Sequence, residues 1–113
     1  MKIQALQLLY SWSIEGTLIS KNSFDQSNHR CVSVEGTTNV IISDNIGFKT
    51  NGHCIYIGFQ SESNLITNNL VSDTKVIRTG DTLSGESDNY PAAFLGRFHP
   101  NDFTHNIAVA GER

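Results

Sequence analysis

Two glutamates of this chain stand where paired carboxylates could do chemistry. Glu15 and Glu35 each belong to a short phrase, WSIEGT and VSVEGT, that recurs after 20 residues. If the phrases occupy equivalent places in neighbouring repeats, the two carboxylates lie about 5 Å apart, a separation that retaining glycosidases use. That mechanism also needs a sheltered pocket that keeps one carboxyl protonated. Without such a pocket we expect the pair to be solvated, or to hold a divalent cation such as calcium.

Histidine and cysteine residues form a second group with potential chemistry. His29 and Cys31 are followed by His53 and Cys54, which places the two cysteines 23 residues apart. The set superficially resembles a zinc site, but the CxxC and HxxxH spacings of such sites are missing. We expect the cysteines to point into the core and each histidine to sit at a turn, hydrogen-bonded to a neighbouring carbonyl. The sequence therefore predicts no metal site.

The two cysteines are expected to stack. In consecutive repeats Cys31 and Cys54 would lie about 4.8 Å apart. A disulfide needs Cβ atoms about 3.8 Å apart and converging bonds, whereas in-register neighbours in a parallel sheet point the same way. We therefore favour two reduced thiols over a disulfide, and the redox compartment stays open.

Aromatic and arginine side chains are the third group, and they suit a sugar-binding surface. Tyr56 and Phe94 are expected to point outward from strands, and Phe59 and Arg97 follow those strands. Aromatic platforms with hydrogen-bonding neighbours are typical of polysaccharide binders, although aromatics interleaved with Asn and Ser also occur on ordinary repeat surfaces. The ligand-binding candidates are Tyr56, Phe59 and Arg97.

Short repeated strands must position all of these residues. Four apolar, β-branched runs each end in an asparagine, with spacings of 23, 24 and 37 residues, at Asn22, Asn45, Asn69 and Asn106. A unit of this length cannot bury its own apolar face, so stacked neighbours must supply the core. The pattern predicts an all-β fold, a right-handed parallel β-helix, which is a single-stranded solenoid of about four rungs.

The asparagines are expected to be structural. Asn tolerates the left-handed backbone of a tight turn, and stacked Asn amides can hydrogen-bond from rung to rung. A second, alternating segment in each rung predicts two further columns of stacked side chains. These columns are Trp12, Val32, Ile55 and Ala93, and Ile14, Val34, Ile57 and Leu95.

The repeat also predicts the domain organisation. Residues 1–113 form a single β-helix domain or fragment, with rungs near 12–31, 32–54, 55–92 and 93–113. The long third interval is explained by about 13 extra residues, expected as a protruding inserted loop over 74–89. Neither end has a recognisable polar cap, so self-association or contact with neighbouring rungs of a longer protein is expected.

Composition excludes several classes of partner. The net charge is −3 and the eight Lys and Arg residues are scattered, so no basic stripe for nucleic acid is present. No apolar stretch approaches the ~20 residues of a membrane span, so we expect no membrane insertion in this segment. Gln4 and Gln7 interrupt the short apolar stretch at the N-terminus, and no clear signal peptide is recognised.

Several of these motifs together resemble a known family. They are His29-Arg30-Cys31, then VEGT at residues 34–37, DNIGF at 44–48, GHC at 52–54 and the segment 92–111. The pattern is similar to the β-helix region shared by the cell-migration-inducing hyaluronidases, their transmembrane relatives and the fibrocystin-like receptors that carry G8 domains. Glu35 stands where that family carries histidine, and the acidic stretch after GHC is reduced.

The resemblance implies a fold and a set of functional hypotheses. It implies an extracellular or cell-surface β-helix segment, with a glycan-binding or structural role. The alternative is part of a hyaluronan-degrading enzyme core, for which Glu35, His53 and Asp44 are the catalytic candidates to test first. As an isolated chain an enzyme is disfavoured, and no cofactor is expected apart from calcium.

Overall fold

The computed structural model describes residues 2–3, 5–9, 12–77, 91–97 and 100–111, and every regular element among them is a strand. The strands are β1 (Lys2–Ile3), β2 (Leu6–Leu9), β3 (Trp12–Ser20), β4 (Ser23–Asp25), β5 (Val32–Glu35), β6 (Thr38–Ser43), β7 (Ile46–Asn51), β8 (Ile55–Ile57), β9 (Leu65–Thr67), β10 (Leu70–Lys75), β11 (Phe94–Gly96), β12 (Asp102–Thr104) and β13 (Ile107–Val109).

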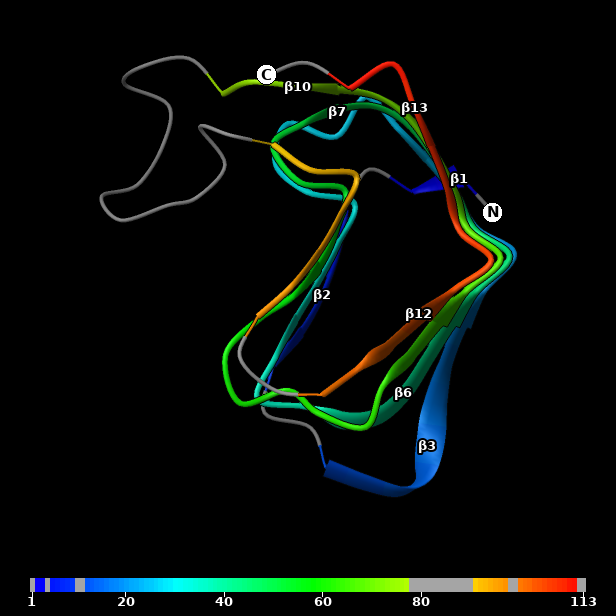
Figure 1. Cartoon of the computed structure of the whole chain (residues 1–113), viewed down its shortest axis with the longest axis vertical. Helices are drawn as coiled ribbons and strands as arrows, with labels where there is room; N and C mark the ends of the chain where they lie inside the picture. Colours follow the sequence, from blue (N-terminus) through cyan, green and yellow to red (C-terminus); the bar gives the residue numbers. More distant parts are fainter. Residues whose placement is uncertain (1, 4, 10–11, 78–90, 98–99, 112–113) are drawn as a thin grey trace.

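The strands form three sheets in which every pairing is parallel. Sheet 1 has the order β1-β4-β7-β10-β13, sheet 2 the order β11-β8-β5-β2, and sheet 3 the order β12-β9-β6-β3. The chain visits the three sheets in turn, so successive rungs overlie one another as the sides of a triangular prism (Figure 1). The fold is a parallel β-helix, which confirms the predicted fold class.

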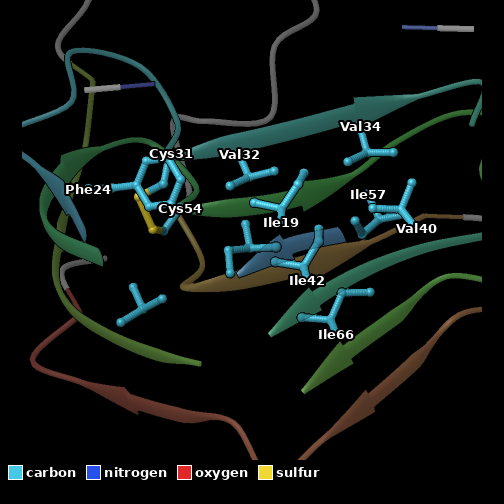
Figure 2. Close-up of a cluster of buried hydrophobic side chains, with 12 residues drawn as sticks. Ile19, Phe24, Cys31, Val32, Val34, Val40, Ile42, Cys54, Ile57 and Ile66 are labelled. Carbon is cyan, nitrogen blue, oxygen red and sulfur yellow. A yellow bond between two sulfur atoms is a disulfide. The ribbon is translucent and has the colours of Figure 1, made fainter. Parts of the chain in front are cut away.

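The interior of the prism is filled by inward-pointing aliphatic residues from all three sheets (Figure 2). The fully buried side chains include Phe24, Val32, Val34, Ile42, Ile57 and Ile66. Because strand residues alternate between the two faces of a sheet, each strand of three to six residues contributes only one to three of them. Each such side chain contributes roughly 1.5–3 kcal/mol through burial, so the stack of rungs makes the core.

Cys31 and Cys54 form a disulfide, with Cα atoms 4.5 Å apart, so the prediction of reduced thiols is wrong. The two residues are stacked and buried as expected, but they lie in the corner before β5 and before β8, outside the regular strands. The constraint that in-register strand residues point the same way therefore does not apply to them. Gly47 backs this crosslink, because a Cβ at that position would overlap the Cys54 sulfur.

The asparagine amides form the expected ladder at the corner between sheets 3 and 1. The Nδ2 of each asparagine donates to the Oδ1 of the next, at 3.2 Å from Asn22 to Asn45, 3.0 Å from Asn45 to Asn69 and 3.0 Å from Asn69 to Asn106. The asparagines are not the left-handed residues of this turn, however. The residue before each of them takes that conformation, with φ between 54° and 58°, at Lys21, Asp44, Asn68 and His105.

The predicted columns are correct in the middle of the stack and wrong at its ends. Val32 pairs with Ile55 and Val34 with Ile57, as expected. Ile55 pairs with Phe94 instead of Ala93, so Phe94 belongs to an inward column and the expectation that it points outward is wrong.

The repeated phrases do not stack. Glu35 ends β5 in sheet 2 and pairs with Leu9, whereas Glu15 lies within β3 in sheet 3. Trp12 pairs with Thr38, across an irregularity in the β3–β6 ladder. The two glutamates are therefore not equivalent, and the paired-carboxylate and calcium hypotheses lose their geometric basis.

The extra residues of the third interval lie between β10 and β11. Thr74 and Lys75 still belong to β10 and pair with Thr50 and Asn51 of β7. The rest of the loop predicted over 74–89 falls almost entirely at residues 78–90, which lie outside the described residues.

Candidate functional site

Tyr56 is the centre of a polar cluster on the outer face of sheet 2. It is the middle residue of β8, and its neighbours Ile55 and Ile57 point into the core, so its own side chain points outward. Its ring is nevertheless only 4% exposed. The Arg30 guanidinium carbon lies 3.8 Å from the ring centroid, and the His53 ring is stacked at 5.8 Å between centroids. The prediction of an exposed tyrosine platform is therefore wrong, because other side chains cover the ring.

A second arginine completes this group, which we call the arginine–tyrosine cluster: Arg30, Tyr56 and Arg97. Arg97 follows β11, where its backbone N–H donates to the Ile57 carbonyl at 3.0 Å. That bond holds Arg97 beside β8, and its Nη1 donates to the Tyr56 hydroxyl at 3.4 Å. Arg30 in turn donates to the Ser33 hydroxyl at 3.3 Å. Cation–π contact of this kind is worth about 0.5–2 kcal/mol, so the ring fixes the position of the Arg30 charge.

A shallow depression adjoins the arginine–tyrosine cluster. It has a volume of about 200 Å³ and is lined by Ala5, Leu6, Gln7, His29, Arg30 and Ser33. Gln7, Ser33 and Tyr56 occupy one outward column, because their strands pair in that register. The face therefore combines two guanidinium groups with amide, imidazole and hydroxyl groups, which suits an oxygen-rich or anionic ligand.

Glu35 and Phe59 meet at the corner between sheets 2 and 3. The Glu35 Oε2 accepts the Phe59 backbone N–H at 3.2 Å. A Cβ added to Gly58 would lie 2.6 Å from the Glu35 carboxyl carbon, so the carboxylate rests directly on the glycine backbone. Phe59 itself is 57% exposed. Of the three ligand-binding candidates, the structure thus brings Tyr56 and Arg97 together and leaves Phe59 at the adjoining corner.

The three catalytic candidates lie at three different corners of the prism. Glu35 is at the end of β5 between sheets 2 and 3, Asp44 lies between β6 and β7, and His53 lies between β7 and β8. Asp44 occupies the corner of the asparagine ladder, on the right in Figure 1. The structure therefore does not bring these three side chains together.

His53 is held inside its corner. It is 1% exposed, and its Nδ1 accepts the Ala92 backbone N–H at 2.9 Å. Because a neutral imidazole accepts with one nitrogen and donates with the other, this bond places the proton on Nε2. His53 thereby ties the chain that enters β11 to the corner before β8.

Metal ligation finds no support in this geometry. Across the residues that the structure describes, no three His, Cys, Asp or Glu side chains are grouped so as to hold an ion. The sulfur atoms of Cys31 and Cys54 are bonded to each other, so neither is a thiolate ligand.

Two features were missed from the sequence. A second ladder joins Asn64 to Asn101, with an Nδ2 to Oδ1 distance of 2.9 Å. Its signal was visible, since each of these residues precedes a ladder asparagine by five positions. Arg30 was read only as part of a family motif, and nothing in the local pattern showed that the chain turns there, at φ 56°, to lay the guanidinium on a ring one rung away.

The fold and the corner ladders define a parallel β-helix repeat protein, and the comparisons place it in one family. The family model described as CEMIP beta-helix matches residues 6–113, so the chain belongs to that family. It is 37% identical over 54 residues to the human protein named cell surface hyaluronidase CEMIP2, which covers 46% of this chain and 4% of the relative. It is 29% identical over 99 residues to a G8 domain-containing protein of Dictyostelium discoideum, covering 87% of this chain and 8% of that relative.

The chain thus spans less than a tenth of the length of these curated relatives. No solved structure matches it. In the part of the chain that the structure describes, no helix has the length and apolar character needed to cross a membrane.

Proposed function

We propose that this β-helix segment binds an acidic polysaccharide through the outer face of sheet 2. The observation that carries the proposal is the arginine–tyrosine cluster, in which Arg30 lies 3.8 Å from the Tyr56 ring centroid and Arg97 donates to the Tyr56 hydroxyl. Planar guanidinium groups bind carboxylate and sulfate groups with paired hydrogen bonds. A ring that fixes an arginine reduces the entropy lost when that arginine binds a ligand.

The surroundings of the cluster favour a sugar over a simple anion. Gln7, His29 and Ser33 line the adjoining depression and offer hydrogen bonds of the kind that sugar hydroxyls make. Phe59 supplies an exposed ring at the next corner. The net charge of −3 opposes a polyanion at long range, so binding depends on these local contacts and weakens steeply with salt.

We further propose an extracellular, cell-surface setting. The human relative is named a cell surface protein. The buried Cys31–Cys54 disulfide supports the same setting, because such bonds persist in oxidising compartments and are rare in the cytosol.

Calorimetric titration with oligosaccharides tests the binding proposal. Hyaluronan fragments stand for uronic acid polymers, and a neutral glucan of equal length is the control ligand. Arg30→Gln and Arg97→Gln are each expected to weaken hyaluronan binding by about tenfold, the loss of one charge-assisted contact of about 1.5 kcal/mol. Lys49→Gln is the matched control, because Lys49 is an exposed cation in β7 of sheet 1. Equal binding by all four proteins, or no binding by the unaltered chain, would refute the proposal.

Hydrolysis of hyaluronan is the second candidate, and the name of the human relative is what favours it. Against it stands the separation of Glu35, Asp44 and His53 at three corners. Size-exclusion chromatography of hyaluronan incubated with the chain, with and without calcium, decides the matter. Shortened polymer that persists in Glu35→Gln would point to residues other than these candidates.

A further inference from the structure

The two ends of the stack are complementary to each other. All three sheets finish at one end with β11, β12 and β13, and at the other with β1, β2 and β3. Every pairing between these ends is parallel, so the unpaired edge of the last rung has the same form as the edge that each inner rung offers to its successor. An incoming rung therefore continues an interface that already recurs within the chain.

The apolar interior is open at the β11–β13 end. Phe103 belongs to the inward column of Ile66, yet Phe103 is 37% exposed whereas Ile66 is fully buried. A hollow of about 370 Å³ lies there, lined by Phe94, Gly96, Phe103, His105 and Asn106. Ala108, in the inward column of Val71, is exposed at the same end. One more rung would bury all of these side chains.

The asparagine ladder has a direction, and the two ends match it. In each step the backbone N–H and the Nδ2 of one asparagine both donate to the Oδ1 of the next, as Asn69 does to Asn106 at 3.0 Å for both bonds. Asn106 is the last residue of the ladder and presents the donor side, with one Nδ2 hydrogen already given to the Ile66 carbonyl at 2.8 Å. Asn22 is the first residue of the ladder and presents the Oδ1 acceptor side.

The strand count says how the ends must join. Sheet 1 has five strands whereas sheets 2 and 3 have four, so both ends contribute a strand to sheet 1. In an unbroken stack of two copies, β13 of the first and β1 of the second would occupy the same place. The two-residue β1 pairs with β4 at two positions, whereas the three-residue β13 pairs with β10 at three. With β13 in that place, Asn106 also lies directly against Asn22 in the ladder.

We propose that a second copy of this chain docks head to tail, with β13 of one copy replacing β1 of the next. Ile107 then pairs with Ser23, and Ala108 with Phe24, following the register that β1 has with β4. The interface is heterologous, so its repetition gives open linear assemblies instead of closed dimers. The proposal is independent of the glycan-binding face, which lies on sheet 2.

Cysteine crosslinking tests the register. Ser23 and Ile107 are both exposed and point outward, so Ser23→Cys with Ile107→Cys leaves the core unchanged. Under mild oxidation this double variant is expected to give a ladder of covalent oligomers on a non-reducing gel, whereas each single variant gives at most a dimer. No ladder would overturn the proposal. A ladder formed only by Lys2→Cys with Ile107→Cys would show that β13 stacks on β1 without replacing it.

Mixing of half-blocked chains tests the polarity. Asn106→Asp with Ala108→Asp blocks the donor end while keeping the Oδ1 that Asn69 uses, and Asn22→Leu blocks the acceptor end. By sedimentation velocity, each variant alone is expected to be monomeric where the unaltered chain associates, and their equimolar mixture to form a 1:1 dimer. Circular dichroism shows that both variants fold. Self-association of either variant alone, or an unaltered chain that is monomeric at every concentration, would overturn the proposal.

Discussion

Replacement of Asn69 by alanine gives the sharpest test of how the fold is held together. Asn69 is 1% exposed in the middle of the ladder. Its Oδ1 accepts the Asn45 backbone N–H and the Asn45 Nδ2, both at 3.0 Å. Its Nδ2 donates to the Ile42 carbonyl at 2.9 Å and to the Asn106 Oδ1 at 3.0 Å. Alanine removes all four bonds at once.

The loss of free energy of unfolding follows from what is left unpaired. Two donors of Asn45 and the Ile42 carbonyl lose their partner in a buried site, while the Asn106 Oδ1 keeps the backbone N–H of residue 69. At roughly 1–3 kcal/mol for each buried unpaired group, with partial relaxation, Asn69→Ala is expected to cost about 3–5 kcal/mol. That is a large part of the roughly 5–15 kcal/mol that stabilises a typical domain.

Asn22→Ala is the matched control, because it removes the same side chain at the end of the same ladder. Only the bond from its Nδ2 to the Asn45 Oδ1 is lost, and the backbone N–H of residue 22 still reaches that oxygen at 3.1 Å. The expected cost is about 0.5–1.5 kcal/mol. Urea unfolding followed by circular dichroism, at concentrations where the chain is monomeric, measures both values. Equal costs for the two variants would refute the view that buried ladder bonds, counted individually, stabilise the stack.

Three further substitutions test the corners. Cys31→Ser with Cys54→Ser opens a loop of 23 residues and is expected to lower the free energy of unfolding by about 3 kcal/mol in the same assay, whereas unchanged stability would show that the disulfide is dispensable. Gly47→Ala places a methyl group against the disulfide and is expected to cost about 1–3 kcal/mol by urea unfolding, and much less when combined with the double serine variant; a cost that stays the same would assign the effect to the backbone instead. His53→Phe leaves the Ala92 N–H without its acceptor and is expected to lower the melting temperature by more than His53→Gln, which keeps an acceptor, and a reversed order would contradict the assigned bond.

The sequence alone was sufficient for the architecture and for the main ladder. Four apolar runs that end in asparagine at regular spacing allow one economical solution, because a short strand can bury its inner face only against a copy of itself one rung away. The register between Val32 and Ile55 followed from the same repeat, since a slip by one residue would turn the apolar side chains out of the core.

Only the tertiary structure decided what lies at the corners and ends. The phrases around Glu15 and Glu35 are alike as text but belong to different sheets, because an extended first rung places Leu6, 26 residues upstream, against Val32. The disulfide depends on corner geometry that the strand spacing does not predict, and the burial of Tyr56 depends on an arginine from the previous rung. Periodicity determines what repeats along a solenoid, whereas the side chains that could bind or react lie at turns, where the path of the chain departs from the repeat and contacts are set by neighbours far away in sequence.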